Sequence, residues 1–162
     1  MRTSDVYVGA ALLGVLAGMR SMAGPAVLGR LSKAGVLDGA KGPLALVSKP
    51  GIGVATGIMT LGEMVADKLP IAPNRTAAGP LLGRAVLGGV AGAALFQAQR
   101  RSAMAGGLIG AAAAVGAAYA AFEIRKQAVR RLGWRDGLVA LAEDAVVAGL
   151  GLALTSRLKA RS

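Results

Sequence analysis

The stretch SAMAGGLIGAAAAVGAAYAAF, residues 102–122, contains 21 residues and no ionisable side chain. At ~1.5 Å of rise per residue, a helix over this stretch crosses a hydrocarbon layer of ~30 Å. Four further apolar runs flank it, over residues 6–29, 50–69, 76–99 and 137–156. We therefore expect an all-α fold, a polytopic membrane bundle of about four to five transmembrane helices, with residues 1–162 as a single membrane domain.

The apolar residues are mostly small. Hydrophobic residues make up 54% of the chain but aromatic ones only 3%, and there are 25 glycines. Small side chains let transmembrane helices approach each other closely, and residues four apart lie on one helix face. The glycine pairs that predict such contacts are Gly14 with Gly18, Gly53 with Gly57, Gly88 with Gly92, and Gly106 with Gly110.

The composition excludes several kinds of site. The chain has no cysteine and no histidine, which rules out disulfides, thiolate and imidazole metal ligands, and Cys or His nucleophiles. The net charge is +11, but no stacking aromatics or recognisable module accompany the basic residues, so we expect no nucleic-acid partner. Loops that contact the anionic headgroups of the lipid bilayer explain this charge more simply. We also expect no cofactor.

The loop charges do not define an orientation if all five runs cross the membrane. Lys and Arg then number eight on one side and nine on the other, so the usual cytoplasmic excess is missing. Two explanations stay open. Either the span count is wrong or one segment is re-entrant, or the chain inserts in both orientations and pairs as an antiparallel dimer. We expect a homo-oligomer.

The first apolar run is interrupted. It follows a basic residue, as a signal sequence does, but Asp5 precedes it and it continues past Arg20, which favours a retained helix over a cleaved leader. Proline lacks the backbone N–H and clashes with the preceding turn, so Gly24-Pro25 is predicted to break this helix. A half-helix that opens at Pro25 would present its positive N-terminus, beside Arg20, to an anion.

Part of this run occurs twice. Residues 20–30, RSMAGPAVLGR, are similar to residues 75–84, RTAAGPLLGR. Internal repeats with Gly/Pro-interrupted helices are typical of transporters, and the repeat halves here would be residues 1–70 and 71–162. Chance similarity in a chain rich in Ala and Gly is the alternative. For Pro80, a helix start near the membrane surface is the simpler interpretation.

Ionisable side chains interrupt the other runs, and each costs ~2.5–3.5 kcal/mol at the membrane centre unless it is paired or hydrated. Glu63 and Asp67 share one helix face, and five spans would place them on the same membrane side as Glu143 and Asp144. We predict that these carboxylates and Arg20 form the binding site of a small transporter or channel for an ion or small polar solute. The supporting residues are Gly24, Pro25, Lys68, Arg75, Pro80 and Arg84.

Two other functions stay open. The Arg and carboxylate side chains can instead act as ion pairs that hold together a structural or assembly protein. Alternatively, Lys68 and Arg75 can hold a phosphate headgroup, with Asp67 as base or metal ligand, in a phospholipid enzyme. No phosphotransferase, P-loop or serine-hydrolase pattern accompanies them, so we expect a protein that is not an enzyme. Glu63 and Asp67 are the candidate ligands for a hard cation.

Four motifs occur in order along the chain: GMRSMAGPA, GEMVADKLPIAPNRT, GPLLGR and LAED. Through them the chain resembles, over most of its length, the bacterial membrane proteins of domain-of-unknown-function family 4126, and the second motif is the most specific. The resemblance implies a polytopic protein of the bacterial cytoplasmic (inner) membrane, without an assigned activity. The positions that it singles out are Arg20, Glu63, Asp67, Lys68, Pro70, Arg75, Pro80, Glu143 and Asp144.

Overall fold

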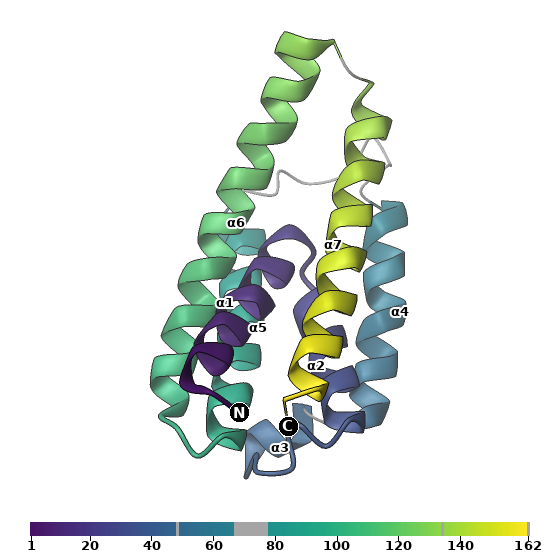
Figure 1. The fold of residues 1–162 in the computed structure, drawn as a ribbon. Coiled ribbons are helices and arrows are strands. Elements are labelled where there is room, and N and C mark those ends of the chain that lie inside the picture. The colour runs from purple at the N-terminus through teal and green to yellow at the C-terminus, as the bar shows by residue number, and fades with distance from the viewer. Residues whose placement is uncertain (48, 67–77, 134, 162) are drawn as a thin grey trace.

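The computed structural model describes residues 1–47, 49–66, 78–133 and 135–161. Within these ranges all regular secondary structure is helical (Figure 1). Three helices are long and apolar enough to cross a membrane, and the first helix is apolar but shorter. The chain is therefore an integral membrane protein, and the predicted all-α fold is confirmed. The helices are α1 (Thr3–Met19), α2 (Ala23–Lys33), α3 (Pro43–Val47), α4 (Pro50–Ala66), α5 (Ala78–Ala98), α6 (Ala103–Leu132) and α7 (Asp136–Lys159), of which α5, α6 and α7 are the three long ones.

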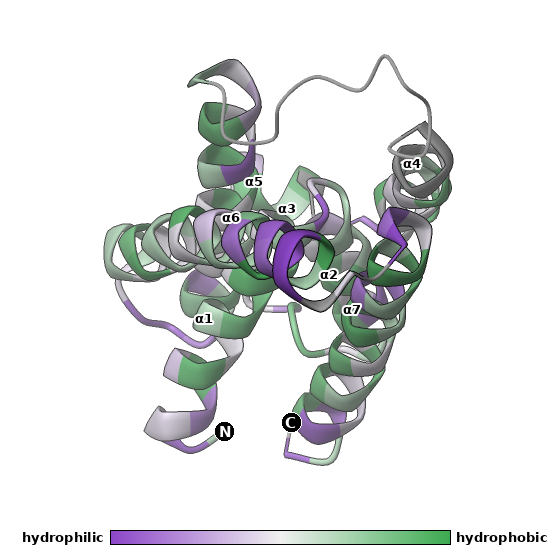
Figure 2. Ribbon diagram, turned by 90° about the horizontal axis from the view of Figure 1, so that it is seen from above, coloured by the Kyte–Doolittle hydropathy of each residue, from purple (hydrophilic) through white to green (hydrophobic). Residues whose placement is uncertain are grey.

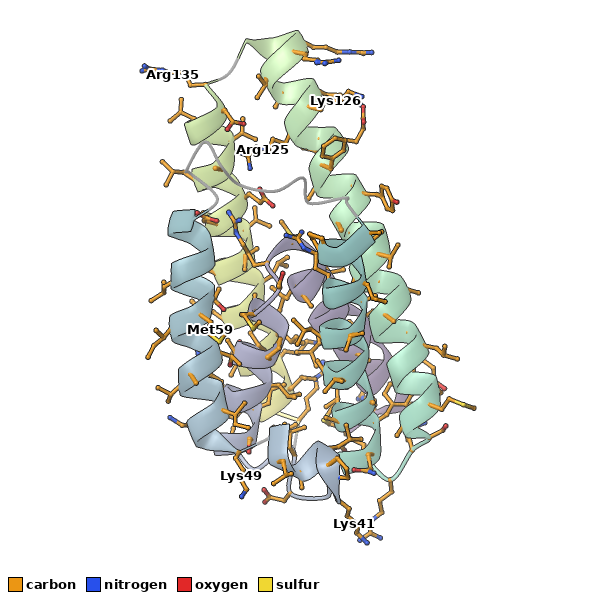
Figure 3. The ribbon with its side chains drawn as sticks, turned by 180° about the vertical axis from the view of Figure 1, so that it is seen from behind. Lys41, Lys49, Met59, Arg125, Lys126 and Arg135 are labelled. Carbon is orange, nitrogen blue, oxygen red and sulfur yellow. The ribbon has the colours of Figure 1, made fainter. Side chains whose placement is uncertain are left out.

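The bundle has an apolar outer surface along its length and charges at its two ends. Large hydrophobic side chains are exposed on all three long helices, as a lipid-facing surface requires. Figure 2 shows hydrophobic residues along the flanks of α1 and α7 and hydrophilic residues at the near end of α6. In Figure 3, Met59 lies on the outside of α4, Lys41 and Lys49 at one end of the bundle, and Lys126 and Arg135 at the other.

The first apolar run forms a helical hairpin instead of one transmembrane helix. Helix α1 runs inward from the N-terminal end of the bundle, and α2 returns to that end (Figure 1). The predicted break is present, but it lies at residues 20–22, where Arg20 has extended backbone angles (φ −138°, ψ 118°). Gly24 and Pro25 lie just after it, in the first turn of α2. Proline is tolerated there, as Pro80 is in the first turn of α5, because first-turn N–H groups have no acceptor within the helix.

This reversal brings both termini to the same end of the bundle (Figure 1) and places Arg2 at that end as well. Ten of the described Lys and Arg side chains lie on or near the end that holds the termini, and five lie at the other end. Relative to the five-span count, the reversal moves one cation, Arg2, to this end, and Lys68 and Arg75 lie outside the described residues. The ten are Arg2, Arg30, Lys33, Lys41, Lys49, Arg100, Arg101, Arg157, Lys159 and Arg161, and the five are Arg125, Lys126, Arg130, Arg131 and Arg135.

Helices α1, α5 and α6 pack backbone to backbone through glycines. A methyl group on Gly14 or Gly18 of α1 would overlap a backbone carbonyl oxygen of α6. Gly88 of α5 lies in the same contact, because a Cβ there would be 2.8 Å from the carbonyl oxygen of Gly110 and 3.3 Å from Cα of Gly14. Three of the four predicted glycine pairs therefore make close helix contacts. Their members are Gly14, Gly18, Gly88, Gly92, Gly106 and Gly110.

Helices α2, α4 and α7 pack less closely. Gly57 of α4, from the fourth predicted pair, has no atom within 4 Å of the position that its Cβ would take. A cavity of about 470 Å³ lies between these three helices. One side of the bundle is thus closely packed and the other is hollowed, and the α1–α2 hairpin belongs to both.

Candidate functional site

Arg20 lies at the tip of the α1–α2 hairpin and is completely buried. Its Nε donates a hydrogen bond of 2.9 Å to Oδ1 of Asp144 on α7, and its Nη2 donates to the same oxygen. The two residues are 124 positions apart in the sequence, so this pair ties the N-terminal hairpin to the last helix. Charge-assisted hydrogen bonds of this kind offset the cost of burying both charges.

Arg84, in the second turn of α5, is also buried and reaches the same tip. Its Nη1 donates a hydrogen bond of 2.7 Å to the backbone carbonyl oxygen of Gly18. Gly18 belongs to the last turn of α1, where the end of a helix leaves carbonyl groups without a donor from the next turn. The guanidinium supplies a donor and matches the negative end of the helix dipole. Arg84 therefore stabilises the end of α1 inside the bundle.

The hairpin tip lies about two-thirds of the way across the bundle from the end that holds the termini, judged from helical rise. Arg84 precedes the end of α5 at Ala98 by 14 residues, and Asp144 precedes the end of α7 at Lys159 by 15. At ~1.5 Å per residue, both lie ~20 Å from that end, within a hydrocarbon layer of ~30 Å. Ionisable side chains at this depth are costly, and in membrane proteins they usually mark a functional site.

Ion pairs lead from this tip to the opposite end of the bundle. Arg125 on α6 binds Asp136 of α7 through hydrogen bonds of 2.7 and 2.6 Å, and its Nη1 lies 3.9 Å from Oε2 of Glu143. Side-chain exposure falls from 62% at Asp136 and 20% at Arg125 to 8% at Glu143. It is 13% at Asp144 and zero at Arg20. Arg125 lies on the side of α6 that faces α7 (Figure 3). We call these five side chains the polar path.

The polar path is closed on the other side of the tip. Fully buried leucines fill the space between the helices there, namely Leu13 and Leu16 of α1, Leu95 of α5 and Leu154 of α7. The glycine contacts of α1 with α5 and α6 leave no room between those backbones. The route that begins at Asp136 therefore ends at Arg20 in this conformation.

The structure brings together part of the predicted site. Arg20, Arg84 and Asp144 meet at the hairpin tip, and Glu143, next to Asp144 on α7, pairs with Arg125. Those that lie outside the described residues are Asp67, Lys68, Pro70 and Arg75, together with the side chain of Glu63, so the predictions made for them stay predictions. Among the described residues, no group of three or more acidic side chains is arranged to hold a metal ion.

Two polar pairs were missing from the predicted site. Arg125 and Asp136 flank Gly133, whose positive φ of 66° ends α6, and this turn is the signal that could have paired them. The second pair lies at the end that holds the termini, where buried Asp5 accepts hydrogen bonds of 2.7 Å from Arg161 and 3.1 Å from Arg157. A lone carboxylate at the start of an apolar helix signals a cationic partner, but only the fold shows which one.

No protein-family model, curated protein or solved structure matches this chain. The chemistry of the site therefore rests on its own geometry. That geometry is a hairpin with a buried arginine at its tip, paired with Asp144 of α7, and a second ionic group of Arg125, Asp136 and Glu143 nearer the opposite end of the bundle.

Proposed function

We propose that the protein is a small transporter or channel for an ion or small polar solute, with the polar path as its route. The observation that carries the proposal is the pair of ionic groups on α7, one of exposed Asp136 and Glu143 with Arg125 and one of Asp144 with completely buried Arg20, joined through the neighbouring residues Glu143 and Asp144. Non-helical backbone and ionisable groups persist at membrane depth where they are buried in protein or line a water-filled cavity. In secondary transporters, substrate and ion sites typically form at interrupted helices.

The chemistry supported at the tip is exchange of ionic partners. An anion that arrives along the path would compete with Asp144 for the guanidinium of Arg20, assisted by the positive N-terminus of α2. A cation would instead compete with Arg20 for the carboxylates of Glu143 and Asp144. Either exchange weakens the contact that links the hairpin to α7. The hairpin then moves against α7 and opens the leucine-filled side.

Flux into liposomes that contain the purified full chain tests this proposal. Glu143→Gln keeps the shape of the side chain but removes a charge of the polar path, which lies 3.9 Å from Arg125. Glu123→Gln is the matched control, because Glu123 pairs with Lys126 at 3.5 Å on the exposed side of α6. We expect wild type to carry a proton, a monovalent cation or an anion. Glu143→Gln should slow this flux roughly tenfold, equal to ~1.4 kcal/mol of barrier, and Glu123→Gln should not.

The complete burial of Arg20 against Asp144 favours one alternative, a structural or assembly protein that this ion pair holds together. In that case, liposomes with folded wild-type protein carry none of these ions faster than empty liposomes. Glu143→Gln would then change at most the free energy of unfolding. Absence of flux in the folded wild-type protein overturns the transport proposal.

Location and assembly follow as further parts of this proposal. The resemblance to family 4126 supports the bacterial cytoplasmic membrane. The protein is expected to form a homo-oligomer, and an antiparallel dimer is one arrangement of it. The phospholipid-enzyme alternative stays a prediction, because Lys68 and Arg75 lie outside the described residues.

A further inference from the structure

The cavity between α2, α4 and α7 opens as a groove on the lipid-facing surface, apart from the polar path. Its volume of about 470 Å³ lies within the ~300–1,000 Å³ that is typical of ligand sites. On α2 and α4 its lining residues recur at spacings of three and four, so the groove runs lengthwise along these helices. Its apolar walls include Val27, Ile58, Leu61, Val147 and Leu152.

The groove has a buried floor and an exposed apolar rim. Val27 and Val147 form the floor and are almost completely buried, whereas Ile58, Leu61 and Leu152 are largely exposed. Gly57 also lines the groove, where a Cβ would meet nothing within 4 Å. In a membrane, an open apolar groove between helices faces lipid chains and not water. Its chemistry therefore fits an occupant with acyl chains.

The length of the groove matches one leaflet of a bilayer. Along α2 it reaches from Ala23, beside the hairpin tip, to Lys33, the last residue of the helix. Ten residues of helix rise ~15 Å, which is half of a hydrocarbon layer of ~30 Å. Acyl chains of a lipid from one leaflet therefore fit along the groove.

The mouth of the groove is cationic. Arg30 and Lys33 line it three residues apart on one face of α2, and both are exposed. Neither has an ionic partner within the part of the chain that the structure describes. Guanidinium and ammonium groups at the membrane surface bind phosphate. A second copy of this chain carries a net charge of +11 and would bring further positive charges to this mouth. Repulsion between like charges therefore disfavours a second copy as the occupant.

From this combination we propose that the groove binds one anionic phospholipid. Its acyl chains lie between α2, α4 and α7, and its phosphate is held by Arg30 and Lys33. The lipid comes from the leaflet at the end that holds the termini. This proposal does not depend on transport, because the groove and the polar path share none of their residues.

Lipid binding by the purified full chain in a neutral detergent tests this proposal. The probes are phosphatidylglycerol, phosphatidylcholine and soluble glycerol phosphate, and the readouts are bound lipid by native mass spectrometry and the shift in Tm. Arg30→Gln with Lys33→Gln removes the cationic mouth. Lys41→Gln with Lys49→Gln is the matched control, since both lysines are exposed at the same end but do not line the groove.

A second pair of variants tests the apolar part of the groove. Gly57→Leu places a side chain inside it, and Gly62→Leu places the same side chain on α4 outside it. Both glycines have open space where a Cβ would be, so both variants should fold.

We expect wild type to bind phosphatidylglycerol roughly tenfold more tightly than phosphatidylcholine. Arg30 and Lys33 attract the net negative charge of the phosphatidylglycerol headgroup, which phosphatidylcholine lacks. The preference should disappear in the Arg30/Lys33 variant, and binding itself should be lost in Gly57→Leu, while both controls bind like wild type. Equal binding of the two lipids, or unchanged binding in either test variant, overturns the proposal. So does stabilisation by glycerol phosphate alone, or a lipid-free dimer that Gly57→Leu abolishes.

Discussion

The two sides of this bundle use glycine in opposite ways. On the α1–α5–α6 side, glycines lie against backbone atoms of a neighbouring helix, and Gly110 leaves no space for a methyl group beside the carbonyl oxygen of Gly88. On the α2–α4–α7 side, Gly57 and Gly149 have no neighbour within 4 Å of a Cβ position. A glycine in an apolar helix therefore brings two backbones into contact where the partner also presents a small residue. Elsewhere it leaves space.

The hairpin tip is where the two sides meet. Arg84 holds the end of α1 from the closely packed side, and Asp144 holds Arg20 from the hollowed side. The first contact anchors the tip to a rigid group of helices, and the second joins it to a helix with few close neighbours. Movement of the tip and binding of a ligand are both expected on the hollowed side.

Asp144→Ala should have the largest effect on this arrangement. The substitution removes the carboxylate that Nε and Nη2 of Arg20 contact, and loss of one member of a buried pair costs ~3–5 kcal/mol. The free energy of unfolding in detergent measures this loss. Arg20→Met with Asp144→Leu should recover most of it, since no unpaired charge remains. The exchange rate of backbone amide hydrogens should rise more in α2 and α7 than in α5 and α6. Wild-type stability in Asp144→Ala would show that this pair does not join the two sides.

Gly110→Ala should have the next largest effect, confined to the closely packed side. Its methyl group would overlap the carbonyl oxygen of Gly88, which belongs to a helix backbone and cannot turn away. We expect a loss of ~2–3 kcal/mol in the free energy of unfolding, the usual cost of overpacking a well-packed contact. Denaturant titration of the purified variant measures it. A neutral result would mean that α5 and α6 separate easily, and that the contrast between the two sides is smaller than the contacts indicate.

Gly149→Ala is the matched substitution on the hollowed side and should have the smallest effect. The methyl group enters open space, and alanine favours a helix more than glycine does, so stability should rise by ~0.5–1 kcal/mol. The same titration measures the change. Destabilisation similar to that of Gly110→Ala would indicate that a second protein copy covers this face of α7.

Much of the fold follows from local sequence signals. The apolar runs predict the long helices, and Ala-Gly-Pro begins both α2 and α5, where the proline is tolerated in the first turn. The spacing of Gly14 with Gly18 predicts a close helix contact, which α1 makes with α6. These signals suffice because each depends on neighbours within a few residues, or on one helix face.

The reversal at Arg20 could not be predicted in this way. Residues 6–29 have the length and polarity of one transmembrane helix, and a break within them is compatible with a kink as well as with a return. The return is specified by contacts with Asp144 and by the bond from Arg84 to Gly18, between residues far apart in the sequence. The placement of Arg20 at the hairpin tip therefore depends on contacts that the local sequence does not reveal. The pairing of Arg125 with Asp136 likewise needs the turn at Gly133 to be known.

The depth of the hairpin tip also determines the order in which the chain enters the membrane. During synthesis, the hairpin leaves the ribosome before Arg84 and long before Asp144, which comes 124 residues after Arg20. An arginine carried to this depth without a carboxylate is strongly disfavoured, so the newly made hairpin stays at the membrane surface. We expect α5 and α7 to insert before the hairpin, because they carry Arg84 and Asp144. We therefore expect the hairpin to reach its place after α7, although it precedes α7 in the chain, and a chain cut before α7 to keep the hairpin outside the bilayer.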